Sequence, residues 1–291
     1  MMRVACIGEA MIEVSMAGTH AQVGVAGDTL NTAVYLKRTA PNMTVDYITR
    51  LGADPFSDQI AQFIGANGIG CSNITRDAGK SPGLYAITTS DSGERSFTYW
   101  RDTSAARDLF GDRDFSMLDE YDAIYISAIS MAILPQEIRL ALAEYLAHAD
   151  ARLIYDSNYR PRLWENVETA RQITGRMWEI ADILLPSLDD EMALFDETAD
   201  TVQARFAQSS GIGALKRGAL GPMSIGSDVT QSYPPATTVI DTTAAGDSFN
   251  GAYVATLLSG ASQADALMAG HMCARYVVGK RGAIVSDSVS G

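Results

Sequence analysis

Short apolar runs alternate along most of the chain with stretches whose apolar side chains recur every three or four positions. The first pattern is typical of buried strands and the second of amphipathic helices. Their alternation predicts an α/β fold, with a mostly parallel sheet covered by helices on both faces. The predicted strands are Val4–Gly8, Thr44–Thr49, Ala123–Ser127, Arg152–Asp156, Ile183–Pro186 and Ile212–Lys216. The predicted helices are Thr29–Arg38, Pro55–Ala66, Pro135–Ala147, Val167–Ile180, Asp189–Phe195, Thr201–Gln208, Ser248–Leu258 and Gln263–Val278.

One region breaks this alternation. Gly83–Thr89 and Arg95–Trp100 are β-rich runs joined by the turn-forming residues Ser90–Glu94, which is a hairpin signal. A further β-capable stretch, Met11–Met16, follows the first predicted strand directly. These segments predict either a small accessory sheet or an edge hairpin of the main sheet.

Ligands in open α/β sheets bind at the carboxyl ends of the strands. Polar residues follow the predicted strands at Gly8–Glu9, at Asp156–Arg160 and at Pro186–Asp190. The loop Asp241–Asp247 precedes a predicted helix and is also polar. We therefore expect the functional site to be built from these segments.

Composition narrows the class of partner. The 291 residues fit one large α/β domain and carry a net charge of −13, with no Lys/Arg cluster longer than a pair. This charge argues against nucleic acid and anionic membrane as partners, but it does not exclude small anionic ligands. The three cysteines, Cys6, Cys71 and Cys273, are widely spaced and are expected to be reduced buried thiols. The apolar run before Glu9 is too short for a signal peptide and no segment is long enough to cross a bilayer, so we expect a cytoplasmic protein.

The most informative motif is Asp241-Thr-Thr-Ala-Ala-Gly-Asp247-Ser-Phe-Asn-Gly-Ala, which runs from a turn of small residues into a helix. Helix N-termini present unpaired N–H groups and positive potential to anions. The amides of Ala244, Ala245, Gly246 and Asp247 are therefore predicted to hold a phosphoryl group. Asp247 is either a helix cap or a base that accepts a proton from a substrate hydroxyl.

This motif resembles the C-terminal signature of the ribokinase-like (PfkB) carbohydrate kinases. The resemblance implies a three-layer α/β/α sandwich spanning residues 1–291, with a β-sheet lid formed by segments about 11–26 and 81–104. It also implies ATP and Mg²⁺, with K⁺ as a further activating ion, and a homodimer or higher homo-oligomer. No P-loop and no dinucleotide fingerprint is present, which argues against the other common phosphate-binding folds.

Two groups of residues are expected to bind the sugar. By resemblance, Gly27, Asp28 and Asn31 contact sugar hydroxyls, although Asp28 would serve equally as an ordinary helix N-cap. Tyr85, Tyr99, Arg101 and Arg160 resemble the corresponding residues of the 2-keto-3-deoxygluconate kinase branch. Arginine matches a carboxylate bidentately, so two arginines indicate a sugar acid rather than a neutral sugar.

The nucleotide and metal sites are implied by resemblance alone. Asn158, Ser187, Lys216, Gly218, Gly221 and Gly246 are expected to lie beside the nucleotide phosphates. Asp190 or Glu191 is expected to support Mg²⁺ through water, since Mg²⁺ retains waters and takes few protein carboxylates. Asp241 and Thr243, together with the Gly282–Ala283 turn, are expected to form a monovalent-cation loop.

The sequence thus predicts an ATP-dependent kinase that converts 2-keto-3-deoxygluconate into its 6-phosphate, with Asp247 as base. The alternatives are the same chemistry on fructose, ribose or a nucleoside, and a non-catalytic sugar-sensing relative.

Overall fold

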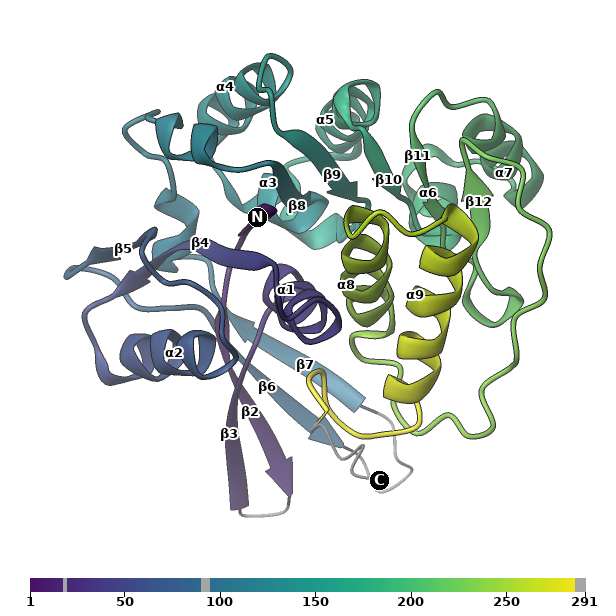
Figure 1. Ribbon diagram of the computed structural model, residues 1–291. Coiled ribbons are helices and arrows are strands. Elements are labelled where there is room, and N and C mark those ends of the chain that lie inside the picture. The colour runs from purple at the N-terminus through teal and green to yellow at the C-terminus, as the bar shows by residue number, and fades with distance from the viewer. Residues whose placement is uncertain (18–19, 90–94, 286–291) are drawn as a thin grey trace.

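The computed structural model describes residues 1–17, 20–89 and 95–285. Its main sheet has the strand order β12-β11-β10-β9-β8-β1-β4-β5 and is parallel except where β12 pairs with β11 (Figure 1). The bounds are β1 Arg3–Ile7, β4 Thr44–Gly52, β5 Ile74–Asp77, β8 Ala123–Ser127, β9 Arg152–Asp156, β10 Ile183–Leu185, β11 Ile212–Leu215 and β12 Met223–Ile225. The predicted parallel sheet is confirmed, and each predicted strand lies within it.

Residues 4–7 of the central strand β1 are apolar without interruption because both faces of the sheet are covered there. In β1, Val4 and Cys6 pack into one hydrophobic cluster, while Ala5 and Ile7 pack into another. Such continuous apolar runs are typical of parallel strands between two helical layers.

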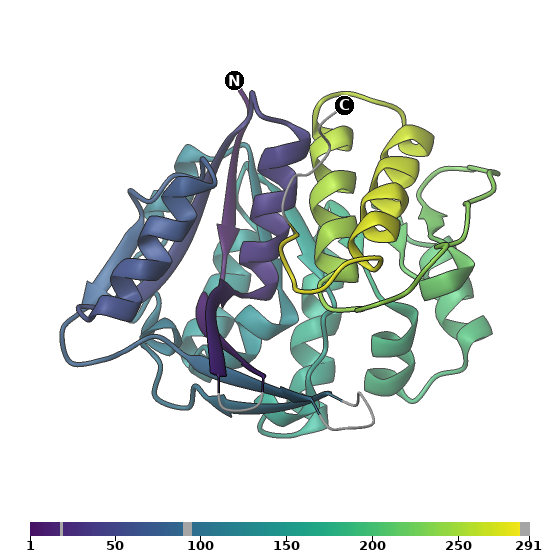
Figure 2. The ribbon, with the colours of Figure 1, turned by 90° about the horizontal axis from the view of Figure 1, so that it is seen from below.

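Helices cover both faces and make three layers (Figures 1 and 2). Residues of α1, α2, α8 and α9 share the cluster that contains Val4, whereas residues of α3, α4 and α5 share the one that contains Ile7. The bounds are α1 Asp28–Thr39, α2 Pro55–Ala66, α3 Ala128–Ile133, α4 Gln136–Leu146, α5 Val167–Ile180, α6 Leu188–Phe195, α7 Ala199–Ala207, α8 Ala245–Leu258 and α9 Gln263–Val277.

A second sheet lies apart from the first and has the strand order β3-β2-β6-β7. The bounds are β2 Met11–Ala17, β3 His20–Ala26, β6 Leu84–Thr89 and β7 Arg95–Trp100. Its strands extend below the main body in Figure 1. The accessory sheet is thus confirmed and the edge-hairpin alternative is wrong, because β7 pairs with β6, and β6 pairs with β2 and not with the main sheet. The predicted turn at Ser90–Glu94 falls outside the described residues.

Some local features differ from the predictions. β3, β5, α3 and β12 were not predicted as elements, since α3 is only six residues long and β5 is short and polar. Asp28 is not the N-cap of α1: Gly27 holds that position, and no side chain caps the helix. Cys6 is buried as expected, but Cys71 and Cys273 are partly exposed. Across the described residues, no helix is both long and apolar enough to cross a membrane.

Candidate active site

Asp247 lies in the first turn of α8, beside α1. Its Oδ2 accepts a 2.8 Å hydrogen bond from Asn31 Nδ2 on α1. The two helices approach closely at Gly251, where an added Cβ would lie 2.6 Å from Thr32 O. The structure therefore brings the predicted base together with the predicted sugar-binding asparagine.

The turn before α8 is shaped by Ala244, which adopts a left-handed conformation with φ 57° as the N-cap residue. This conformation is uncommon for a residue with a Cβ and is found where the surroundings hold it in place. The Ala245 N–H donates to Thr242 O at 3.2 Å, so this amide is already paired. Gly246 and Asp247 carry the next N–H groups of the first turn, where intrahelical partners are missing.

Lys216 adds a cation to this helix end. Its Nζ is the group nearest to Gly246, 3.9 Å from where a Cβ would stand. The same ammonium donates to Asp156 Oδ1 at 2.6 Å and to Asn250 Oδ1 at 3.2 Å. The helix N-terminus and Lys216 together form a positive site suited to a phosphoryl group.

The electrostatics of the site favour a basic Asp247. Burial, with the nearby Asp28 and Asp156 carboxylates, raises the pKa of Asp247 to about 8, against the opposing effects of Asn31 and Lys216. Burial also raises the pKa of Asp28, although its hydrogen bond from Ser127 acts in the other direction. An aspartate with a raised pKa holds an abstracted proton better than an exposed aspartate with an ordinary pKa.

Asp28 joins three segments at the edge of the site. Its Oδ2 accepts hydrogen bonds from Ser127 Oγ, at the end of β8, and from Asn158 Nδ2 at 3.0 Å. Asn158 has a positive φ of 20°, in the loop that follows β9. The predicted nucleotide-side asparagine and the predicted sugar-side aspartate therefore contact each other directly.

The small sheet contributes the predicted aromatic and arginine residues on one face. Tyr85 pairs in register with Tyr99 on β7 and with Glu13 on β2, and its hydroxyl donates to the Glu13 carboxylate. Arg101, which directly follows β7, forms a buried ion pair with Glu9. The tyrosine rings lie 5.6 Å apart, and Trp100 lies on the opposite face, as the strand period predicted.

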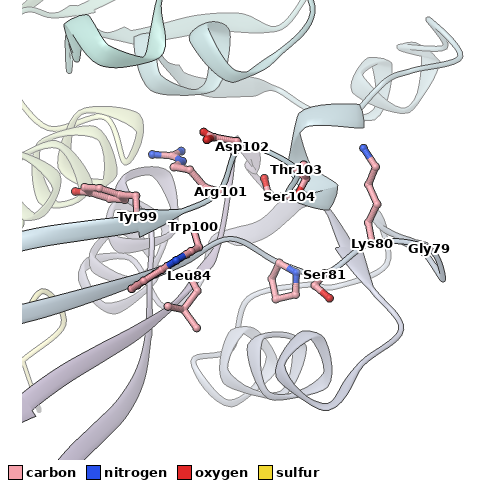
Figure 3. Close-up of a pocket in the computed structure, with 11 residues that line it drawn as sticks. Gly79, Lys80, Ser81, Leu84, Tyr99, Trp100, Arg101, Asp102, Thr103 and Ser104 are labelled. Atoms are coloured by element: carbon pink, nitrogen blue, oxygen red, sulfur yellow. The ribbon is translucent and has the colours of Figure 1, made fainter.

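A shallow pocket of about 610 Å³ surrounds the end of β7 (Figure 3). Tyr99 and Arg101 line it together with Asp102, Leu84 and the segment that contains Lys80. The sequence placed Glu9 among the strand-end segments without a specific role, and it gave no indication of Glu13, although these carboxylates hold Arg101 and Tyr85.

The two acidic residues predicted for the metal lie in the first turn of α6 and point in different directions. Asp190 faces the site: its Oδ2 accepts from Ser157 Oγ at 3.3 Å and its Oδ1 lies 3.5 Å from Arg160 Nη1. Burial raises the pKa of Asp190. The predicted nucleotide-side residue Ser187 is close by, since its N–H donates to Ser157 Oγ at 2.9 Å.

Glu191 does not join this group. It is fully buried on another side of α6, where it accepts from Trp178 Nε1 at 3.2 Å and from Arg205 Nη2 at 2.9 Å. Adjacent residues on a helix point in different directions, so only one of the two acids reaches the strand ends.

The remaining predicted residues lie in two turns. Gly218 begins a short 3-10 turn between β11 and β12, and Gly221 follows that turn; both have positive φ. Asp241 accepts from Thr243 N and from Gly282 N, both at 3.0 Å. The predicted cation loop and the Gly282–Ala283 turn are therefore joined through one carboxylate.

The residues present fit a nucleotide with a water-bound metal. Lys216 and the N-terminus of α8 suit phosphates, and the Asp190 carboxylate has oxygens of the kind that Mg²⁺ prefers. Among the described residues, no three His, Cys, Asp or Glu side chains gather closely enough to hold a metal by themselves. This donor set suits Mg²⁺, which keeps most of its waters and binds substrate phosphates.

Comparison with known proteins agrees with this geometry. A model described as pfkB family carbohydrate kinase matches residues 1–289. The chain belongs to the PfkB family of carbohydrate kinases. It is 40% identical over 300 residues to the 2-dehydro-3-deoxygluconokinase of Escherichia coli (strain K12), with 97% of each chain covered. It is also 40% identical over 298 residues to the protein of that name from Dickeya dadantii (strain 3937), covering 97% of this chain and 96% of the relative.

The fold of this PfkB protein matches solved structures as well. The fructokinase of Vibrio cholerae O395, in its fructose, ADP and calcium ion bound form, aligns with a TM-score of 0.82 at 22% identity. The alignment covers 97% of this chain and 94% of the fructokinase. The ribokinase-like fold predicted from the C-terminal motif is thus confirmed.

Proposed function

We propose that this PfkB protein transfers the terminal phosphoryl group of ATP to the 6-hydroxyl of 2-keto-3-deoxygluconate, also named 2-dehydro-3-deoxygluconate. The observation that carries the proposal is the position of the Asp247 carboxylate. It lies at the N-terminus of α8, near Lys216, and accepts a hydrogen bond from Asn31 on α1. The relatives that cover nearly the whole chain bear the name of this activity, which supports the choice of sugar.

Asp247 acts as the general base in this proposal. Its carboxylate takes the proton of the sugar hydroxyl as the oxygen attacks the phosphorus, and the bond from phosphorus to the bridging oxygen of ADP breaks. The hydrogen bond from Asn31 fixes the orientation of the carboxylate. Its raised pKa matches the task of holding a proton near neutral pH.

The N-terminus of α8 and Lys216 stabilise the charge on the moving phosphoryl oxygens. The N–H groups of Gly246 and Asp247 belong to the first turn, where the helix dipole favours negative charge. The left-handed Ala244 sets the direction of this turn. The nucleotide side of the site is formed by Lys216, Asn158, Ser187, Gly218 and Gly221.

Two ions complete the proposed site. Asp190, with bound waters, would hold Mg²⁺, which supplies charge neutralisation on the donor phosphates. Asp241 and Thr243 would hold a monovalent cation such as K⁺ next to the anion turn. Glu191 is left out of the metal site because it is bound to Arg205.

The carboxylate of the sugar acid lies between Arg101 and Arg160 in this proposal, with Tyr85 and Tyr99 beside it. Gly27 and Asp28 lie on the hydroxyl side, together with Asn31. The small sheet acts as a lid that excludes water, because water competes with the sugar as phosphoryl acceptor. We propose one domain over residues 1–291, a cytoplasmic location and a homodimer or higher homo-oligomer.

Replacement of Asp247 by Asn tests the base. The variant keeps shape and hydrogen bonding but cannot accept a proton, so we expect kcat to fall about 10²–10⁴-fold while both substrates still bind. Turnover is measured by direct detection of sugar phosphate, and binding by calorimetry with a non-hydrolysable ATP analogue. A variant with near-native kcat would refute the role of Asp247.

A substrate panel tests the choice of sugar. Fructose, ribose and nucleosides are compared with 2-keto-3-deoxygluconate at equal concentration. If one of the neutral compounds had the highest kcat/KM, the proposed sugar-acid specificity would be wrong. Ligand binding with no turnover on any of them would favour the sugar-sensing alternative.

A further inference from the structure

Glu9 lies where the main sheet meets the small sheet. It follows β1 by two residues, and its side chain is 1% exposed. Its Oε2 accepts a hydrogen bond from Arg101 Nη2. Nothing in the proposed reaction gives this carboxylate a role.

Three segments that carry proposed sugar contacts pack directly against Glu9. A Cβ at Gly27 would lie 2.2 Å from the Glu9 carbonyl oxygen, and a Cβ at Gly83 would lie 2.6 Å from Glu9 Oε1. The third segment contains Arg101. Gly27 thus leaves room for the Glu9 backbone, whereas Gly83 leaves room for its carboxylate.

Arg101 is held by two supports. Besides the Glu9 carboxylate, the Tyr99 ring lies under its guanidinium, 6.0 Å from carbon to ring centroid. Arg101 is only 7% exposed, and its Nε has no hydrogen-bond partner among the described residues. Figure 3 shows its side chain directed to the opposite side of the small sheet from Trp100 and Leu84. A buried guanidinium bound through one nitrogen keeps donors for a second anion.

We propose that Glu9 is a positioning residue that sets the preference of the site for a sugar acid over a neutral sugar. By holding Nη2 of Arg101, it fixes the plane of the guanidinium so that the remaining N–H groups meet the substrate carboxylate. This inference rests on the proposed function, in which Arg101 binds that carboxylate.

Two substrates isolate this effect. The first is 2-keto-3-deoxygluconate. The second is 3-deoxyfructose, in which C1 is a hydroxymethyl group instead of a carboxylate. The readout is selectivity, defined as kcat/KM for the acid divided by kcat/KM for the neutral analogue. A general loss of folding or of catalysis lowers both values and leaves this ratio unchanged.

Two variants separate geometry from charge. Glu9→Gln keeps an oxygen at the same reach but loses the charge, whereas Glu9→Asp keeps the charge but is one methylene shorter. If Glu9 acts by positioning Arg101, the Glu9→Gln variant should retain selectivity within about threefold. The Glu9→Asp variant is expected to lower selectivity at least tenfold, mainly by raising KM for the acid, because the shorter side chain draws the Arg101 guanidinium out of place.

Two other results would overturn the proposal. Unchanged selectivity in both variants would show that Glu9 only supports the fold. If Glu9→Gln changed the selectivity and Glu9→Asp left it normal, the charge of Glu9 and not its position would be what matters. If Glu9→Gln does not fold because Arg101 is left without a counter-charge, the Asp variant alone decides between positioning and a structural role.

Controls complete the experiment. Asp46→Asn removes another buried carboxylate near an arginine, early in β4 and away from the strand ends that form the site, and should leave selectivity unchanged. In Arg101→Ala, selectivity should be lost, and adding Glu9→Asp should lower it no further. Wild-type protein that fails to phosphorylate the acid would refute the proposed function itself, a result distinct from the failure of the Glu9 variants.

Discussion

Asp247 shows how a single residue takes its chemistry from its neighbours. An aspartate in the first turn of a helix ordinarily interacts with the helix amides and ionises easily. Here burial and the carboxylates of Asp28 and Asp156 act against ionisation, while Asn31 and Lys216 favour it. The balance leaves the carboxyl group as a base suited to neutral or slightly alkaline pH.

This balance predicts a pH dependence. Asp247 must be ionised to accept a proton, so protonation inactivates the enzyme and kcat/KM should rise with pH up to about 8. Replacement of Asp28 by Asn removes a repelling charge and should shift this rise to lower pH. Both profiles are measured by direct product detection between pH 5.5 and 9, values chosen to span roughly two units on the acid side of the pKa. A wild-type profile that is flat over this range would contradict the assignment.

Arg160 offers a second test at this scale. It is half exposed and lies 3.5 Å from Asp190, a pair that water and salt weaken. A substrate carboxylate can therefore displace Asp190 at little cost. We expect Arg160→Ala to raise KM for 2-keto-3-deoxygluconate at least tenfold and KM for 3-deoxyfructose less than threefold, in line with the energy of a charged hydrogen bond. Equal increases in the two KM values would remove Arg160 from the carboxylate site.

At the scale of elements, the site depends on how closely α1 and α8 approach. Asn31 lies on α1 and Asp247 on α8, so their 2.8 Å contact is set by the spacing of the two helices. Gly251 permits this spacing because it has no side chain, so its backbone can lie directly against the Thr32 carbonyl and the backbone of Leu36. The packing of α1 against α8 therefore also sets the distance between Asn31 and Asp247.

Gly251→Ala should separate these helices. The added Cβ would lie 2.6 Å from Thr32 O, so overpacking should lower the free energy of unfolding by about 1–3 kcal/mol. It should also lower kcat, since the bond between Asn31 and Asp247 lengthens. Unfolding is followed by urea denaturation, and kcat is measured without denaturant.

Gly175→Ala is the matched control. Gly175 lies inside α5 with no atom within 4 Å of an added Cβ, so alanine should stabilise the protein by about 0.5–1 kcal/mol and leave kcat unchanged. Stabilisation by both substitutions would show that α1 and α8 are not in tight contact.

At the scale of the whole molecule, the proposed substrate site spans both sheets. Arg101 belongs to the end of the small sheet, whereas Asp247 and Arg160 belong to the main body. The buried pair of Arg101 with Glu9 already joins the two parts without ligand. A ligand that contacts both parts should stabilise the native state as a unit.

Ligand-induced stabilisation is therefore expected to depend on the carboxylate. At 100 times its Kd, 2-keto-3-deoxygluconate should add about 2.7 kcal/mol to the free energy of unfolding. For a protein of this size the corresponding rise in Tm is roughly 5 °C. The same concentration of 3-deoxyfructose should give a clearly smaller shift in a thermal unfolding scan. Equal shifts would mean that the carboxylate adds nothing to binding.

Much of the fold could be predicted from the sequence, because the signals were local. Strands such as Val4–Gly8 are apolar without interruption, and α8 follows a turn of small residues that only a helix start explains well. The short elements β5 and α3 were missed because a few residues carry too little periodicity. The N-cap of α1 was misplaced by one residue, since both Gly27 and Asp28 are common at that position.

By itself, the sequence determined the class of fold, the turn of small residues before α8 and the residue types that suit a sugar acid. These properties follow from periodicity and from motifs of adjacent residues, which need no knowledge of distant contacts. Only the tertiary structure decided that Asp190 rather than Glu191 faces the site, and that Glu9 holds Arg101. These pairings join residues far apart in the chain or distinguish two neighbours on one helix, and packing in three dimensions settles both.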